Sequence, residues 1–109
     1  MSLSDISVTV ERDRALVVLR GEHEAYSAHK LGRQLEALLD EGVPVAVDLR
    51  QTAFMDSTVV GALLAAKRRA DTLGLEFLLI MGDSTGWPVR RLLEVTGLDS
   101  TFEMVERPL

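Results

Sequence analysis

The stretch VAVDLRQTAFMDSTVVGALL, residues 45–64, joins a predicted β-strand to a predicted α-helix. The β-branched run at residues 43–49 predicts a buried strand, with its proline near the entry, where a missing N–H does least harm. From about Ser57 to Leu73 the apolar period becomes that of a helix, and Gly74 follows as a stop signal. The oxygen-rich triplet at residues 56–58 therefore lies at a strand-to-helix corner.

The rest of the chain continues this alternation of strand and helix patterns. The first two strands are joined by a charged turn and are expected to pair antiparallel. Strands are predicted at residues 6–10, 16–19, 43–49, 76–81 and 102–105, and helices between the N-cap Ser27 and Gly42, from Ser57 to Leu73, and from Pro88 to Gly97. The order β-β-α-β-α-β-α-β predicts one α/β domain over residues 1–109, with an open mixed β-sheet and right-handed crossovers.

Composition limits the classes of function. The chain has 109 residues, a formal net charge of -5, no cysteine and two histidines. An acidic chain is expected to repel a phosphate backbone, so nucleic acid is not a predicted partner. Without cysteine there is no disulfide or thiolate chemistry, and His23 and His29 are interpreted as polar surface residues. We therefore expect no metal and no redox role.

The cellular location is predicted from the N-terminal segment and from the length of the apolar runs. No basic segment followed by an apolar one opens the chain, and the longest apolar runs are too short to cross a bilayer. The protein is accordingly expected to be cytoplasmic, without direct membrane insertion. The glycines do not form a phosphate-cradling pattern, so no bound nucleotide or other cofactor is predicted.

The segment GDSTG, residues 82–86, matches the G-x-S-x-G nucleophile elbow and lies between a strand and a helix. An elbow serine needs a histidine later in the chain, and none follows Ser84. We interpret the segment as a turn that prepares the next helix, with an esterase kept as a hypothesis to test. Trp87, directly after it, is either a surface anchor for a partner or a staple between loop and core.

Asp56, Ser57 and Thr58 have two interpretations. Ser57 is a good N-cap, and its hydroxyl would accept a hydrogen bond from an amide one turn in, worth about 1 kcal/mol. Alternatively, Ser57 is modified: phosphorylation adds about -1.5 to -2 charge, which a helix N-terminus tolerates through free N–H groups and the macrodipole. With Asp56 beside it, a phosphoserine would repel a partner that had accepted the neutral hydroxyl. Met55 and Phe54 are expected to lie partly exposed at the rim of this corner.

Three segments resemble the STAS domains, and within them the bacterial anti-sigma factor antagonists. GEHEAYSAHKL at residues 21–31 resembles the family's G-E-[LIV]-D-x-x-[ST]-A-x-x-L segment, and residues 45–64 resemble its F-[MIL]-D-S-[ST]-G region. PVRRLLEVTGLDSTFEM at residues 88–104 resembles the third conserved segment. The three occur in the family's order and cover nearly the whole chain, which makes the predicted fold specific.

The resemblance implies a binding module rather than an enzyme. Ser57 would be the phosphoacceptor, ahead of Thr58, for a partner that is both an anti-sigma factor and a serine kinase, and a phosphatase would reset the cycle. Unphosphorylated, the domain would bind that partner and release a sigma factor. The residues implied or expected at the contact are Glu24, Ser27, Asp48, Met55, Asp56, Ser57, Thr58, Val59 and Val60.

The chain departs from the family at three positions near this contact, one of which is His23, where the family has an apolar residue. Val59 stands where the family has a glycine, and its β-branched side chain would stiffen the first turn and obstruct close approach by a kinase. Glu24 stands for the usual aspartate. A second hypothesis is therefore a STAS domain without a phosphoswitch, acting as a subunit of a lipid-transport ABC system or as a stress-signalling scaffold.

Overall fold

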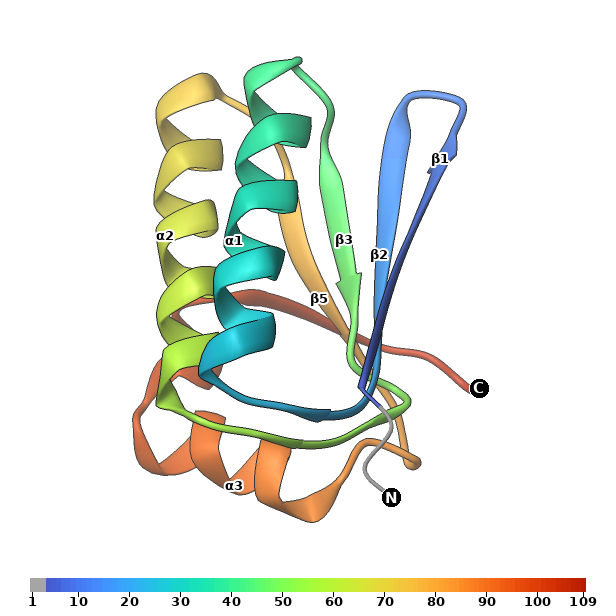
Figure 1. Cartoon of the computed structure of the whole chain (residues 1–109), viewed down its shortest axis with the longest axis vertical. Coiled ribbons are helices and arrows are strands. Elements are labelled where there is room, and N and C mark those ends of the chain that lie inside the picture. The colour runs from blue at the N-terminus through green and yellow to red at the C-terminus, as the bar shows by residue number, and fades with distance from the viewer. Residues whose placement is uncertain (1–3) are drawn as a thin grey trace.

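The computed structural model describes residues 4–109 and consists of one six-stranded sheet with three helices (Figure 1). Residues 1–3 lie outside the described residues. They belong to the predicted domain and to the N-terminal segment that was considered as a signal sequence. The elements in chain order are β1 (Asp5–Glu11), β2 (Arg14–His23), α1 (Ala25–Asp40), β3 (Val45–Asp48), β4 (Thr52–Met55), α2 (Ser57–Leu73), β5 (Phe77–Met81), α3 (Trp87–Val95), the 3-10 helix η1 (Leu98–Ser100) and β6 (Glu103–Glu106).

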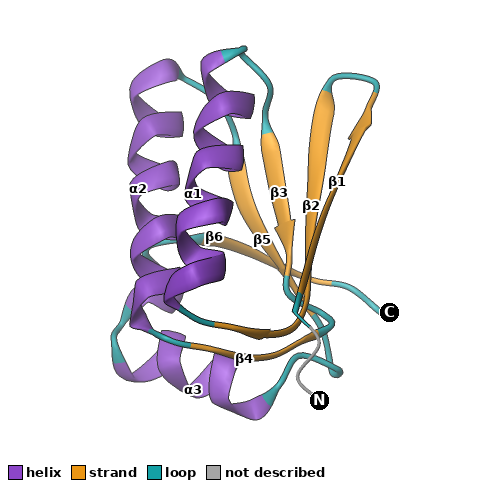
Figure 2. Ribbon diagram, in the orientation of Figure 1, coloured by secondary structure: helices purple, strands orange, loops and turns teal. Residues whose placement is uncertain are grey.

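The sheet has the order β1-β2-β3-β5-β6, with β4 paired to the end of β2. β1 and β2 form the expected antiparallel hairpin, whereas the β2–β3, β3–β5 and β5–β6 pairs are all parallel. The chain moves across the sheet in one direction, and right-handed crossovers then place their helices on the same face. Figure 2 shows α1 and α2 side by side over the strands, with α3 across their lower end. The predicted open, mixed α/β sheet is confirmed.

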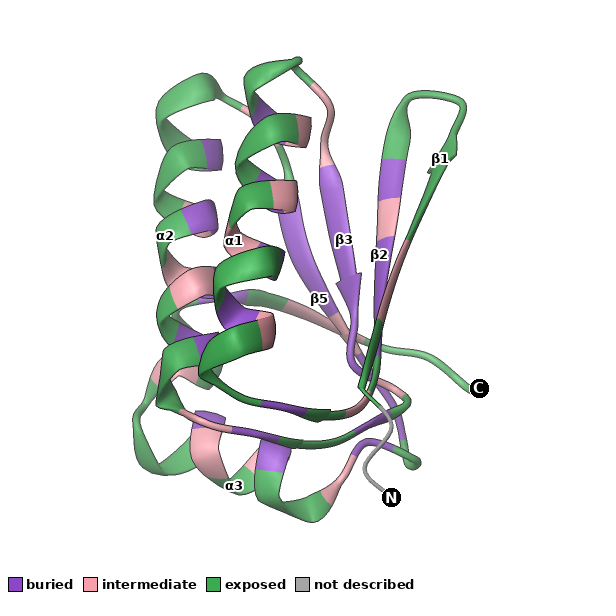
Figure 3. Cartoon of the chain, in the orientation of Figure 1, coloured by how far each residue is buried: buried purple, intermediate pink, exposed green. Residues whose placement is uncertain are grey.

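The core lies between the helix layer and the sheet. Alternate residues of the central strands face the helices, and on α1 the buried positions recur every three or four residues, as the helical period requires. Figure 3 shows the central strands mostly buried and the outer faces of both long helices mostly exposed. The largest fully buried aliphatic side chains are Leu19, Leu31, Leu35, Leu39, Leu49, Met55, Leu63, Leu79, Met81 and Leu93.

Two features of the fold differ from the sequence-based expectation. β4 was not predicted, because the segment TAFM is short and lacks the alternation of a half-buried strand. The first helix begins at Ala25 with Glu24 as its N-cap, so Ser27 lies inside the first turn and is not the cap. The second helix has the predicted bounds, Ser57–Leu73, and ends at Gly74 with φ +69°.

β4 also supports the third helix. The Gly86 N–H donates to the carbonyl oxygen of Thr52 at 2.8 Å, and Gly86 is the N-cap of α3. A Cβ atom at Gly86 would lie 2.1 Å from the carbonyl oxygen of Ala53, well inside van der Waals contact. The sequence thus keeps a glycine here because the start of α3 packs directly on the β4 backbone, which fixes α3 relative to the corner before α2.

We predict that Gly86→Ala destabilises the protein. Gly86 has φ -58°, which any residue adopts, so the substitution tests the lack of space alone. Overpacking of this kind costs about 1–3 kcal/mol of unfolding free energy, and contact with backbone favours the upper end. The matched control is Gly61→Ala in α2, where no atom lies within 4 Å of the added Cβ, and helix propensity predicts a gain of about 0.5–1 kcal/mol. Urea unfolding measures both; equal stability of Gly86→Ala and wild type would contradict the packing described.

Candidate functional site

The candidate site is built by the pairing of β2 with β4. The two strands run parallel, with His23 opposite Met55, and each passes directly into a helix. The residues that follow, Glu24 and Asp56, are the N-caps of α1 and α2. Since neighbouring strands lie about 4.8 Å apart, the two helix N-termini start side by side, at the lower end of the helix layer in Figure 1. The Asp56 N–H adds a hydrogen bond of 3.3 Å to the His23 carbonyl oxygen.

Asp56, and not Ser57, caps the second helix. Its Oδ1 accepts hydrogen bonds from the Thr58 N–H at 3.0 Å and the Val59 N–H at 3.3 Å. The Thr58 hydroxyl also donates to the same carboxylate. The hydrogen bond from the Thr58 hydroxyl, together with those from the backbone N–H groups, holds the pKa of Asp56 below the ordinary aspartate value of 3.8. The carboxylate is therefore ionised at neutral pH. The capping interpretation of Ser57 is therefore wrong.

Ser57 is left exposed with its hydroxyl unused. As the first residue of α2, it has no hydrogen-bond partner for its hydroxyl anywhere in residues 4–109, whereas the neighbouring Thr58 hydroxyl is held by Asp56. Two of the first-turn N–H groups are already used by Asp56. A group attached to Ser57 would thus find only the Ser57 N–H and the helix dipole on this turn, next to an ionised carboxylate.

Glu24 and Ser27 lie at the adjacent helix start. The Ser27 hydroxyl accepts a hydrogen bond from the Glu24 N–H and donates to the Glu24 carbonyl oxygen, both at 3.1 Å. Glu24 is exposed and Ser27 is half-buried. The structure therefore brings these two predicted contact residues to the same edge as Asp56, Ser57 and Thr58. We call these five residues the acidic corner.

Three other predicted contact residues are buried. Met55, Val59 and Val60 belong to the hydrophobic core and have at most 6% of their surface exposed. Because their side chains pack in the core, their expected exposure at the contact surface is wrong for this fold. Val59 in particular is fully buried, so its β-branched side chain does not obstruct access to Ser57.

Asp48 is also buried, and it holds the turn between β3 and β4. Its carboxylate accepts from Arg50 Nε at 3.0 Å, Arg50 Nη2 at 2.7 Å and the Arg50 N–H at 2.9 Å. Burial raises the pKa of Asp48, but the hydrogen bonds and charge of Arg50 oppose this effect and leave the pKa below its ordinary value. Asp48 acts as an internal partner of Arg50, and its predicted place at the contact surface is wrong.

Exposed aromatic residues occur on α1 and β4, which build the acidic corner, and at the start of α3, which packs on β4. Tyr26, in the first turn of α1, is 89% exposed, and Phe54 in β4 is 37% exposed. Trp87 is 72% exposed and follows Gly86, so the staple interpretation is wrong and a surface anchor stays a prediction. Sequence reasoning missed Tyr26, although its position off the helix face of Leu31 was a usable signal.

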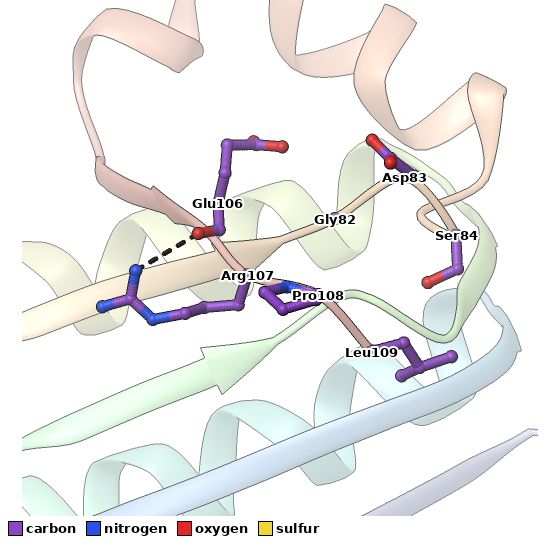
Figure 4. A pocket seen from close by; sticks show the side chains of 7 residues that line it. All are labelled: Gly82, Asp83, Ser84, Glu106, Arg107, Pro108 and Leu109. Atoms are coloured by element: carbon purple, nitrogen blue, oxygen red, sulfur yellow. Dashed lines mark hydrogen bonds between the residues drawn. The ribbon is translucent and has the colours of Figure 1, made fainter.

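The side chains of His23 and Ser84 both lie within hydrogen-bond distance of a backbone carbonyl oxygen. His23 is 1% exposed, with Nε2 2.9 Å from the Arg20 carbonyl oxygen, so its expected place on the surface is wrong. The Ser84 hydroxyl donates to the Arg50 carbonyl oxygen at 2.6 Å and holds a turn. The hollow beside it is lined by residues 82–84 and 106–109, none of which is a histidine (Figure 4).

Within residues 4–109 no group of three His, Cys, Asp or Glu side chains is arranged to hold a metal ion. None of the helices in the same residues is both long and apolar enough to span a bilayer.

The chain is similar to known proteins in both its sequence and its fold. Residues 6–106 match a family model described as a Mlab, STAS domain. The chain is 31% identical over 104 residues to the anti-sigma-B factor antagonist of Listeria monocytogenes, covering 92% of this chain and 89% of that protein. The Listeria innocua protein of the same name is equally similar.

Solved structures share the fold. The crystal structure of an anti-sigma factor antagonist from Mycobacterium paratuberculosis superposes with a TM-score of 0.76 at 22% identity, covering 94% of this chain and 85% of that one. The phosphorylated form of SpoIIAA, a Bacillus cell fate determinant, gives a TM-score of 0.74 at 18% identity, over 97% and 92% of the two chains. Both likenesses concern the fold.

We predict that the Asp56 cap contributes stability that depends on pH. The folded-state pKa of Asp56 lies below the unfolded value, so its contribution is complete above that value and is lost as the pH falls through the folded pKa. Asp56→Ala should cost about 1 kcal/mol of unfolding free energy at pH 7. The difference from wild type should shrink as the carboxylate is protonated.

Urea unfolding at pH 7 and below pH 4 measures this difference. Asp13→Asn is the matched control, since Asp13 is an exposed acid of the β1–β2 turn without a hydrogen bond or ion pair to any residue from 4 to 109. A cost of Asp56→Ala that is the same at both pH values would refute the role of the ionised cap.

Proposed function

Since this chain belongs to the STAS domain family, and within it to the anti-sigma factor antagonists, we propose that it binds an anti-sigma factor through the acidic corner and so releases a sigma factor. The observation that carries this proposal is the exposed, unbonded hydroxyl of Ser57 beside the ionised cap Asp56. We further propose that the partner is a serine kinase, that phosphorylation of Ser57 ends binding, and that a phosphatase restores it. Such a role places the protein in the cytoplasm.

Ser57 is the better phosphoacceptor of the two hydroxyl residues in this turn. A kinase must bring the acceptor oxygen in line with the γ-phosphate, which favours a hydroxyl that is exposed and free of hydrogen bonds. The Thr58 hydroxyl is engaged by Asp56, and the Asp56 bonds would have to break before it could react. The buried side chain of Val59 leaves the approach to Ser57 open.

A phosphate on Ser57 would change the charge of the corner more than its structure. Asp56 and Glu24 already make this edge negative, and a phosphoserine adds about -1.5 to -2. Because Asp56 keeps its own amide donors, the helix start does not need to rearrange. A partner surface that accepts the neutral hydroxyl beside two carboxylates would then lose binding through desolvation and repulsion.

The exposed aromatic residues give this surface an apolar rim. Tyr26 and Phe54 lie within two residues of the N-caps Glu24 and Asp56, Trp87 lies on α3, which packs on β4, and aromatic side chains often dominate the energy of protein interfaces. We propose that the partner covers these residues and places basic groups against Glu24 and Asp56. In this role the chain is a binding module and a kinase substrate, and it carries out no catalysis itself.

A STAS domain without a phosphoswitch is the second candidate. It is favoured by the matching family model, whose description names no sigma-factor pathway. In that role the domain would serve as a subunit of a lipid-transport ABC system or as a stress-signalling scaffold. An anti-sigma kinase gene beside the gene for this chain supports the first candidate, and a transporter permease gene supports the second.

We predict that the purified chain gains the mass of one phosphoryl group when it is incubated with ATP and the kinase-type anti-sigma factor encoded nearby. Ser57→Ala should abolish the gain, because it removes the free hydroxyl, and Thr58→Ala should retain it. Intact-mass spectrometry measures all three proteins. Phosphorylation that persists in Ser57→Ala would refute the assigned acceptor, and an unmodified wild type that forms no complex with the anti-sigma factor would refute the function.

A further inference from the structure

The two long helices form a basic face on an acidic protein. The chain carries 12 Lys and Arg residues against 17 Asp and Glu residues. On α1 and α2 this balance is reversed, since their acidic residues are only Glu36, Asp40 and Asp71. Their basic residues are Lys30, Arg33, Lys67, Arg68 and Arg69. Within these two helices positive side chains therefore outnumber negative ones by two, whereas the whole chain is net negative.

A groove runs between these helices on their outer side, with a hollow of about 510 Å³. Its floor is lined by small residues of both helices, which cannot fill the space: Ala28, Gly32, Ala62, Ala65 and Ala66. A Cβ added to Gly32 would lie 3.8 Å from the Ala62 Cβ, so the two helices pack closely there. Ala65 is exposed, and the floor is accessible from outside.

Charged side chains stand along the rim of the groove. Arg33 of α1 is exposed and forms no ion pair within residues 4–109. Arg69 of α2 reaches across to α1, where its Nε donates to Asp40 Oδ1 at 2.9 Å. Glu36 also lines the groove. Arg33 is therefore a cation on the rim that no carboxylate among the described residues neutralises.

The groove continues from the acidic corner. Its lining begins at Ala28, about one turn after the N-cap Glu24, and at Ala62, nearly two turns after the N-cap Asp56. Both helices run parallel from that edge (Figure 1). The acidic corner and the groove thus form one face, with negative charge at the corner and the positive charge of Arg33 on the rim of the groove. This arrangement would fix the orientation of a partner as well as its place.

We propose that this groove receives an amphipathic helix of the anti-sigma factor, with small apolar side chains on the Ala and Gly floor and carboxylates against Arg33. This inference rests on the proposed function and extends its contact surface. A helix fits because the hollow lies between two neighbouring helices and its floor is apolar, as in helix-binding grooves. An anionic membrane fits less well, because Glu36 and the Arg69–Asp40 pair lie on the same rim.

The test compares opposite charges at one position. Binding of the purified anti-sigma factor to the full chain is measured by calorimetry for wild type, Ala65→Glu, Ala65→Lys and Arg33→Glu, with circular dichroism melting as the check on folding. Ala65→Glu and Arg33→Glu should weaken binding at least about tenfold through repulsion of the partner carboxylates, and Ala65→Lys should weaken it far less.

Two controls match these substitutions outside the groove. Ala37→Glu places the same new charge at an exposed alanine of α1 that does not line the groove. Arg12→Asp reverses a charge in the β1–β2 turn, where φ is +51° and aspartate is tolerated. Both controls should bind within about twofold of wild type, since long-range effects of net charge are small at physiological salt.

The outcomes separate this inference from the function on which it rests. A wild type that binds no anti-sigma factor overturns both. Wild-type binding that all groove variants retain overturns the groove alone, and equal loss in Ala65→Glu and Ala65→Lys overturns the acidic helix. Binding to vesicles of equal parts phosphatidylglycerol and phosphatidylcholine that Arg33→Glu abolishes, with anti-sigma factor binding unchanged, assigns the face to a membrane instead.

Discussion

The carboxylate of Asp56 is the interaction on which the candidate site depends. By accepting the Thr58 and Val59 N–H groups and the Thr58 hydroxyl, it satisfies the start of α2 and leaves Ser57 as the hydroxyl without a partner in that turn. The same bonds keep the carboxylate ionised. One residue therefore both frees the proposed acceptor and supplies the charge beside it, which is what a switch by repulsion requires.

Asp56 can act in this way because the strands hold it in place. Pairing of His23 with Met55 sets the two helix starts next to each other, and Gly86 lets α3 pack on the backbone of β4 from the other side. The buried Asp48–Arg50 pair fixes the turn that leads into β4. The groove between α1 and α2 follows from the same arrangement, since parallel helices that start together leave a continuous seam when small residues line it.

Much of the fold could be predicted from sequence, because the spacing of apolar residues in a long segment indicates whether it forms a helix or a strand. The helix Ser57–Leu73 has its predicted bounds, and the hairpin and mixed sheet were expected. Features set by contacts distant in sequence could not. β4 is a strand only because the end of β2 lies beside it, and the choice of Asp56 over Ser57 as the cap depends on where β4 ends. The burial of His23, Asp48 and Val59 likewise depends on which side of a strand end or helix meets the core. The start of the helix at Ser57 was therefore predicted correctly, but too many of the residues around it were expected to be exposed.

A phosphate on Ser57 controls binding in the proposed mechanism, and this control can be measured on a single preparation of the protein. The dissociation constant of the anti-sigma factor complex is determined for one preparation of the chain before phosphorylation, after stoichiometric phosphorylation at Ser57, and after enzymatic removal of the phosphate. We expect phosphorylation to reduce the affinity roughly a hundredfold or more, and removal of the phosphate to restore it fully. Equal dissociation constants for the unmodified and phosphorylated protein would contradict it.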